Sequence, residues 1–168
     1  MNKQRGFTLV ELLVVIAIIG ILSTIVVSGL TSARASSRDA RRISDIKSIQ
    51  VALALYYNDN SQYPLTLSSL VPTYMGILPK DPVTNADYKF SVFNASGTSN
   101  CSTNLPVRYQ LAANTEALSG SGLPSDDADF TIGAGSSCTG SLAKFHGAAT
   151  DCSGTSAGTD NCYDVVNN

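Results

Sequence analysis

Three carboxylates gathered in four positions are the closest approach to a metal site in this 168-residue sequence. They belong to Asp126, Asp127 and Asp129, and clustered carboxylate oxygens suit a hard cation such as calcium. An EF-hand interpretation of this stretch fails, because Ile132 stands where the turn of that loop requires Gly. The run therefore predicts either a calcium site or a solvated acidic turn.

The residues that commonly perform catalysis are sparse and isolated. His146 is the single histidine, and no carboxylate or Cys is spaced to work with it. The glycine pairs within residues 120–122 and 133–135 lack the strand, helix and Lys that surround a phosphate-binding loop. We therefore expect a protein that is not an enzyme and has no catalytic residues.

Four cysteines occur beyond residue 100, at positions Cys101, Cys138, Cys152 and Cys162. They form no Cys-x-x-Cys motif, so zinc and redox chemistry are not indicated. Residues 133–168 are rich in Gly, Ser and Thr, a composition that buries too little apolar area to order itself, and disulfides would compensate. Three pairings are possible from spacing alone. We favour Cys138 with Cys152, whose loop closure would contribute ~3 kcal/mol, and Cys101 with Cys162.

Charge and hydropathy divide the chain into two unlike parts. Residues 1–47 carry seven basic and three acidic side chains, and the remainder carries four and ten. No charge occurs from Leu12 to Ala33, a stretch that as a helix would span ~33 Å, the thickness of a hydrocarbon core. A cleaved secretory signal ending at Ala33-Arg34-Ala35 is the alternative, but its apolar region would be unusually long. We predict a transmembrane helix over residues 7–33.

Glu11 interrupts the apolar stretch that starts at Phe7. An acidic side chain at a helix centre in lipid costs ~2.5–3.5 kcal/mol on insertion scales, so it needs a partner. A short basic leader, Met1–Arg5, precedes Gly6 and Phe7, and Glu11 is fifth counting from Phe7. This pattern closely resembles the prepilin signal of type IV pilins and of type II secretion pseudopilins. The resemblance covers residues 1 to about 64 well.

The resemblance implies a specific processing step at Gly6 and Phe7. In that family a membrane-embedded aspartyl peptidase cuts after the glycine and methylates the new amino terminus. Cleavage here would leave N-methylated Phe7 with a cationic amine. In a polymer, that amine on a neighbouring subunit could neutralise Glu11, a charge that lipid cannot solvate. The alternative is that Glu11 is tolerated because it reaches the headgroup layer.

Orientation in the membrane follows the family and not the positive-inside rule. The far flank carries five basic residues, namely Arg34, Arg38, Arg41, Arg42 and Lys47. The leader carries only Lys3 and Arg5, so charge counting alone would turn the amino terminus outward. The family places the leader in the cytoplasm, and the cysteines favour an oxidising exterior for the body. We predict a single-pass protein of the cytoplasmic membrane with its amino terminus inside.

Helical periodicity continues beyond the apolar stretch. Apolar residues recur at spacings of three and four, at Ile43, Ile46, Ile49, Leu53 and Tyr56. No Pro occurs from Phe7 to Tyr57, so one continuous helix of roughly 76 Å is predicted. Tyr63-Pro64 closes this element, because the residue before Pro is disfavoured in a helix.

Arg34, Arg38 and Arg42 lie at i, i+4 spacing and form one cationic stripe. Their mutual repulsion must be offset by Asp39 and Asp45, by facing subunits or by lipid phosphates. The stripe has no interleaved aromatic residues and lies beside the predicted bilayer. Nucleic-acid binding is therefore not predicted.

The remainder predicts an α+β fold, because strand-like alternation appears over residues 88–93, 107–113 and 129–132. An antiparallel meander of these strands would cover the apolar face of the long helix. The predicted divisions are a leader (1–6), a transmembrane and polymerisation half-helix (7–33), an amphipathic half-helix (34–57), a connector with the sheet (58–132) and a Cys-containing C-terminal region (133–168).

These features predict the structural subunit of a type IV pilus-like filament, made as a membrane-anchored precursor that assembles with copies of itself. The implied partners are membrane lipid, the prepilin peptidase and an inner-membrane assembly platform, and the filament would be extracellular or periplasmic. Cysteines, frequent in the C-terminal loops of pilins, favour a pilin over the alternative, a major-type pseudopilin of a secretion or DNA-uptake system. A second alternative is a membrane-anchored extracytoplasmic binding domain that does not polymerise.

Overall fold

The computed structural model describes residues 7–94, 105–128, 152 and 161–167, and of residues 24–29 it describes the backbone alone. The chain divides at Ala35 into two compact units, and both include part of one long helix. That helix, α1, runs from Leu9 to Asn60 over 52 residues. The prediction of one continuous helix is confirmed, with its end three residues later than expected.

The end of α1 follows from its last residues. Ser61 adopts a left-handed backbone conformation with φ of 55°, which stops helical propagation. Its N–H still donates to the Tyr57 carbonyl at 2.7 Å, and the Asn60 side-chain amide caps the Tyr56 carbonyl at 2.9 Å. Tyr63-Pro64 then leads into the connector, as the sequence predicts.

The first unit contributes the N-terminal part of α1. Its apolar side chains from Leu9 to Leu22 are exposed. Within the described part of the chain, no helix combines the length and the hydropathy of a membrane span. The span predicted over residues 7–33 is therefore not confirmed by the structure.

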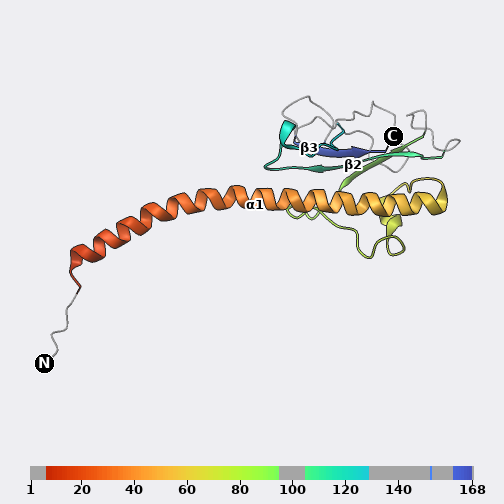
Figure 1. Ribbon diagram of the computed structural model, residues 1–168. Helices are drawn as coiled ribbons and strands as arrows, with labels where there is room; N and C mark the ends of the chain where they lie inside the picture. The colour runs from red at the N-terminus through yellow and green to blue at the C-terminus, as the bar shows by residue number, and fades with distance from the viewer. Residues whose placement is uncertain (1–6, 95–104, 129–151, 153–160, 168) are drawn as a thin grey trace. The chain divides into compact units, whose positions relative to one another are not determined.

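A three-stranded antiparallel sheet forms in the second unit (Figure 1). Its strands are β1 (Lys89–Phe93), β2 (Arg108–Asn114) and β3 (Cys162–Val166), in that spatial order. Val92 pairs with Tyr109, and Leu111 pairs with Val165. The first two strands and the antiparallel arrangement confirm the prediction.

The third strand of the described sheet was not predicted. The sheet takes β3 from Cys162–Val166, which lies inside the region expected to remain irregular. The predicted strand at residues 129–132 lies outside the described residues. Tyr163 and Val165 give β3 an apolar face, and β2 supplies a paired edge, so long-range pairing orders a segment that composition alone marks as irregular.

The core of the second unit lies between α1 and the sheet. Ile46, Ile49 and Leu53 of α1 are fully buried, which confirms the apolar face predicted from their spacing. Figure 1 shows the sheet on one side of this part of α1 and the connector, with the short 3-10 helix η1 (Leu67–Leu70), on the other. A second short 3-10 helix, η2 (Gly120–Gly122), follows β2. Full burial of each aliphatic side chain contributes roughly 1.5–3 kcal/mol.

Candidate functional site

The first turn of α1 is closed by two residues that bond each other. Thr8 precedes the helix, and its hydroxyl accepts the Glu11 backbone N–H at 3.3 Å. The Glu11 carboxylate in turn accepts the Thr8 backbone N–H at 2.8 Å and the Thr8 hydroxyl at 2.7 Å. This reciprocal arrangement is a capping box, which satisfies donors that the first helical turn leaves unpaired.

The capping box changes the interpretation of Glu11. Sequence reasoning treats its carboxylate as a group without a partner in its own chain, whereas Thr8 supplies two hydrogen bonds. Thr8 was missed, although Thr8-Leu9-Val10-Glu11 fits the Thr-x-x-Glu pattern of a capping box and could have been recognised. These bonds satisfy oxygen lone pairs but bring no positive charge, and no cationic side chain of the described residues pairs with the Glu11 carboxylate.

The capping box also places Glu11 relative to the predicted processing site. Its carboxylate reaches the N–H of Thr8, which is one residue from Phe7. Phe7 is 83% exposed and precedes the helix. Gly6, the predicted cleavage residue, lies outside the described residues. The described geometry thus puts the single acidic side chain of the apolar segment at the end where the new amine would form.

The same N-terminal residues match a known family. Residues 1–27 match the family described as the prokaryotic N-terminal methylation motif. The chain is also 39% identical, over 114 residues, to type II secretion system core protein G of Vibrio cholerae, a match covering 58% of this chain and 77% of that protein. The chain belongs to the core protein G family.

Further members of the family match with similar strength. Core protein G of Escherichia coli is 41% identical over 104 residues, covering 52% of this chain and 71% of its own length. The Aeromonas hydrophila protein is 38% identical over 98 residues, covering 48% and 68%. No solved structure matches the chain. The relatives favour the secretion pseudopilin, which the sequence left as the alternative to a pilus subunit.

The second unit of this core protein G family member contains an ionic group, here called the Arg42 cluster (Asp39, Arg42, Asp81 and Glu116). Asp39 and Arg42 are buried, Asp81 is partly buried, and the Glu116 side chain is 32% exposed. Arg42 Nε donates to Asp81 Oδ2 at 2.6 Å, and its Nη1 donates to Asp39 Oδ1 at 2.7 Å and pairs with Glu116 Oε1 at 2.6 Å. Arg38 also bonds the Glu116 carboxylate, with Nε 2.9 Å from Oε1. The cationic stripe predicted on α1 is therefore offset, at Arg38 and Arg42, inside the same chain.

Hydrogen bonds in the Arg42 cluster favour the charged forms of Glu116 and Asp81. Bonds from Arg38, and then from Arg42, lower the pKa of Glu116 to about 2 although partial burial opposes the shift. Burial favours neutral Asp81, but bonds from Arg42 and from the Thr84 and Val83 amides outweigh it and lower the pKa of that carboxyl. A groove of about 430 Å³ lies beside the cluster, lined in part by Arg42, Asp81 and Glu116.

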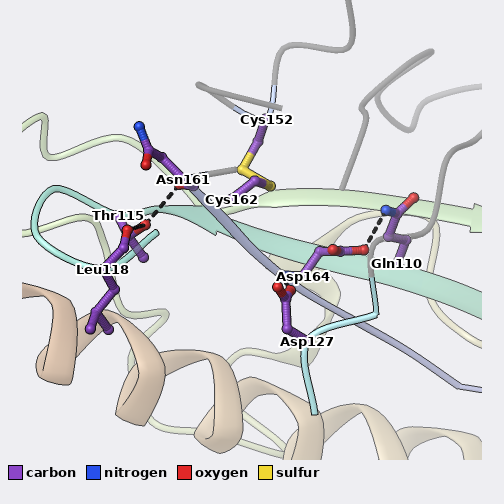
Figure 2. Close-up of a disulfide and its surroundings, with 8 residues drawn as sticks. All are labelled: Gln110, Thr115, Leu118, Asp127, Cys152, Asn161, Cys162 and Asp164. Atoms are coloured by element: carbon purple, nitrogen blue, oxygen red, sulfur yellow. Dashed lines mark hydrogen bonds between the residues drawn. A yellow bond between two sulfur atoms is a disulfide. The ribbon is translucent and has the colours of Figure 1, made fainter. Parts of the chain in front are cut away.

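The disulfide of the C-terminal region joins Cys152 to Cys162, with their Cα atoms 5.2 Å apart (Figure 2). The predicted pairings of Cys138 with Cys152 and of Cys101 with Cys162 are therefore wrong. Both bonded cysteines are fully buried and pack with Ala112 of β2, because β3 begins at Cys162 and pairs with β2. Cys101 and Cys138 lie outside the described residues.

The acidic run predicted to bind calcium contacts β3. Asp127 Oδ1 accepts the Asp164 N–H at 2.9 Å, and Asp126 Oδ2 accepts the Tyr163 hydroxyl at 3.0 Å. Asp129 lies outside the described residues. The described portion of the chain contains no group of three acidic, His or Cys side chains that could hold a metal. Two of the three predicted ligands thus serve the fold, and calcium binding stays a prediction.

His146, which the sequence does not predict to be catalytic, lies outside the described residues. The family is a structural one, which agrees with the expectation of a subunit without catalytic residues.

Proposed function

We propose that this chain is a structural subunit of the pseudopilus of a type II secretion system. The methylation motif over residues 1–27, together with the relatives named core protein G of such a system, supports this assignment. The precursor is anchored in the cytoplasmic membrane by the N-terminal part of α1, with residues 1–6 in the cytoplasm. Prepilin peptidase removes that leader, and an inner-membrane platform feeds the subunit into a periplasmic filament.

Processing at Gly6 and Phe7 and pairing at Glu11 are the chemical steps of this proposal. Cleavage hydrolyses the Gly6-Phe7 peptide bond. A methyl group then passes from a sulfonium methyl donor, which is released as a thioether, to the new amine, and the protonated N-methyl amine leaves a cation at Phe7. The capping box holds the Glu11 carboxylate toward that end of the chain, and its two hydrogen bonds from Thr8 do not cancel its charge. The Phe7 amine of an adjacent copy supplies the missing counter-ion in the filament, because a charge excluded from water requires one.

Intact mass spectrometry of the protein purified from cells tests the assignment. The expected mass corresponds to loss of residues 1–6 and gain of one methyl group. A matched Gly6→Asp variant is expected to keep its leader, because a carboxylate at the scissile position blocks the peptidase by size and charge. An unprocessed wild-type chain would contradict the proposal and favour a membrane-anchored binding domain that does not polymerise.

A further inference from the structure

The Arg42 cluster joins three segments that are far apart in the sequence. Arg42 is a charged residue with only 3% of its surface exposed, and it lies on α1. Asp39 comes from the preceding turn of the same helix, Asp81 from the connector and Glu116 from the loop after β2. The sheet side and the connector side of the second unit thus meet at one guanidinium.

The Asp39 side chain also binds the backbone of the loop after β2 that contains Glu116. Its carboxylate is fully buried and accepts consecutive N–H groups from Glu116 at 3.0 Å, Ala117 at 2.7 Å and Leu118 at 3.1 Å. It also accepts from Arg42 Nη1 at 2.7 Å. One helical side chain therefore holds three successive peptide groups of another segment.

The apolar core fixes the placement of these segments less strictly. Ile46, Ile49 and Leu53 contribute burial, which is non-directional and tolerates sliding as long as apolar area stays covered. A shift of one residue along α1 moves the contact by ~1.5 Å and turns it by about 100°. Hydrogen bonds of about 3 Å with preferred angles do not survive such a displacement. The Arg42 cluster therefore permits only one position of these segments along α1, whereas the apolar core alone would permit several.

Net stabilisation is a weak explanation for such a group. Removing charges from water costs several kcal/mol per ion, and apolar replacement of a whole buried ionic group is often neutral or favourable. Three carboxylates, of Asp39, Asp81 and Glu116, also outnumber the two guanidinium groups of Arg38 and Arg42 that contact them. Selection of one register is the role that directional, buried ionic contacts perform better than apolar ones.

We infer that Arg42 and Asp39 are positioning residues for filament assembly. They fix the register and rotation of the sheet, the connector and the loop at 116–118 on α1, and so determine which surfaces of the body meet neighbouring copies. The second half of this inference rests on the proposed function, because it requires a polymer in which α1 is the shared element. The first half concerns the isolated subunit and can be tested alone.

Three variants of the full chain distinguish an effect on the position of the segments along α1 from an effect on the stability of the fold. The neutral variant Asp39→Asn/Arg42→Met/Asp81→Asn/Glu116→Gln removes every charge of the Arg42 cluster while keeping side chains of similar size. Arg42→Lys keeps the charge but loses the guanidinium fork that bonds several carboxylates at once. Arg41→Met is the matched control, because Arg41 is adjacent on α1 and its side chain is 65% exposed.

Distance distributions between two spin labels report the register in detergent-solubilised subunits. The labels are attached through keto amino acids at Lys47 on α1 and Lys80 in the connector, both about half exposed, so the cysteines are left untouched. Wild type and Arg41→Met are expected to give one narrow distribution. The neutral variant is expected to unfold at nearly the wild-type temperature but to lose the single narrow distribution. If it does not fold, Arg42→Lys decides the question.

The helical twist of assembled filaments, measured by electron cryomicroscopy, is the second readout. The neutral variant and Arg42→Lys are expected to give a shifted or heterogeneous twist, and Arg41→Met the wild-type twist. A folded neutral variant, or an Arg42→Lys variant, with both the wild-type distance distribution and the wild-type twist would overturn the inference. Failure of the wild type itself to polymerise would refute the proposed function. The label distances would still test whether the Arg42 cluster fixes the position of the connector on α1.

Discussion

Glu11 accepts the backbone N–H of Thr8 at 2.8 Å while donating its own N–H to the Thr8 hydroxyl at 3.3 Å. The Glu11 carboxylate, which the sequence predicts to pair with an amine of a neighbouring subunit, therefore also caps α1 within its own chain. Capping needs a hydrogen-bond acceptor, whereas pairing with an amine needs a charge. The two roles can be separated by substitution.

Glu11→Gln should keep the capping box but abolish or disorder filaments. Gln supports the same reciprocal bonds as Glu in this motif, and it carries no charge to pair with the Phe7 amine. Membrane insertion and leader cleavage should continue, as they should in Glu11→Val, which lacks both roles. Filaments are counted by electron microscopy and processing is followed by mass. Normal filaments from Glu11→Gln would show that the charge pair is not needed.

Thr8→Val should have the opposite effect. It removes the capping hydroxyl and leaves the Glu11 charge in place, so the first turn of α1 should lose about 0.5–2 kcal/mol of stability. Hydrogen exchange of the backbone amides of residues 9–12 measures this loss directly, and Thr8→Ser, which keeps a hydroxyl, is the matched control. Unchanged exchange in Thr8→Val would mean that the capping box does not form in the membrane-bound chain.

Acid should weaken the second unit through Glu116. Its pKa is lowered to about 2 in the folded chain from an ordinary value of 4.5. Stability from this group is therefore complete above the unfolded value and is lost as the pH falls from about 4.5 toward 2. The lowered pKa of Asp81 adds a loss of the same sign.

Glu116→Gln should flatten this acid dependence. Denaturant unfolding of the full chain in detergent, repeated across that pH range, gives the slope for each variant. Asp87→Asn is the control, because the Asp87 side chain is 59% exposed and lies outside the Arg42 cluster. Equal slopes in wild type and Glu116→Gln would contradict the assignment.

Loss of the disulfide should destabilise the sheet. The bond closes a loop between residues ten positions apart, and removing a cross-link of this kind typically costs about 2–4 kcal/mol. Cys152→Ala and Cys162→Ala should lower the free energy of unfolding by similar amounts, and the double variant should add little, because all three remove one bond. Additive losses would indicate that burial of each side chain matters and the bond does not.

Local patterns explain which parts of the fold were predictable. The recurrence of Ile46, Ile49 and Leu53 predicted the buried face of α1, and strand-like alternation predicted β1 and β2 within one residue at each end. These signals repeat over several residues of one segment. β3 has only five residues in a Gly- and Ser-rich region, so its partner β2 supplies the information that its own sequence lacks.

The ionic contacts were predictable only in part. Repulsion along the arginine stripe implied that acidic partners exist, and Asp39 was among those considered. Glu116 was not considered, because it is 78 positions from Arg38 and no local pattern connects them. The disulfide was mispredicted for the same reason. Spacing limits the pairings to three, and only the position of Cys162 at the start of β3 brings it to Cys152.

The amino-acid sequence alone identified the N-terminal methylation motif, because the leader, Gly6, Phe7 and Glu11 lie within eleven consecutive residues and their spacing can be read directly. It also determined the course of α1, since helical periodicity is local. Only the tertiary structure decided what Arg42 and Cys162 bond to. Their partners come from other segments, and a side chain's choice among distant groups depends on which of them the packed sheet and helix bring within about 3 Å.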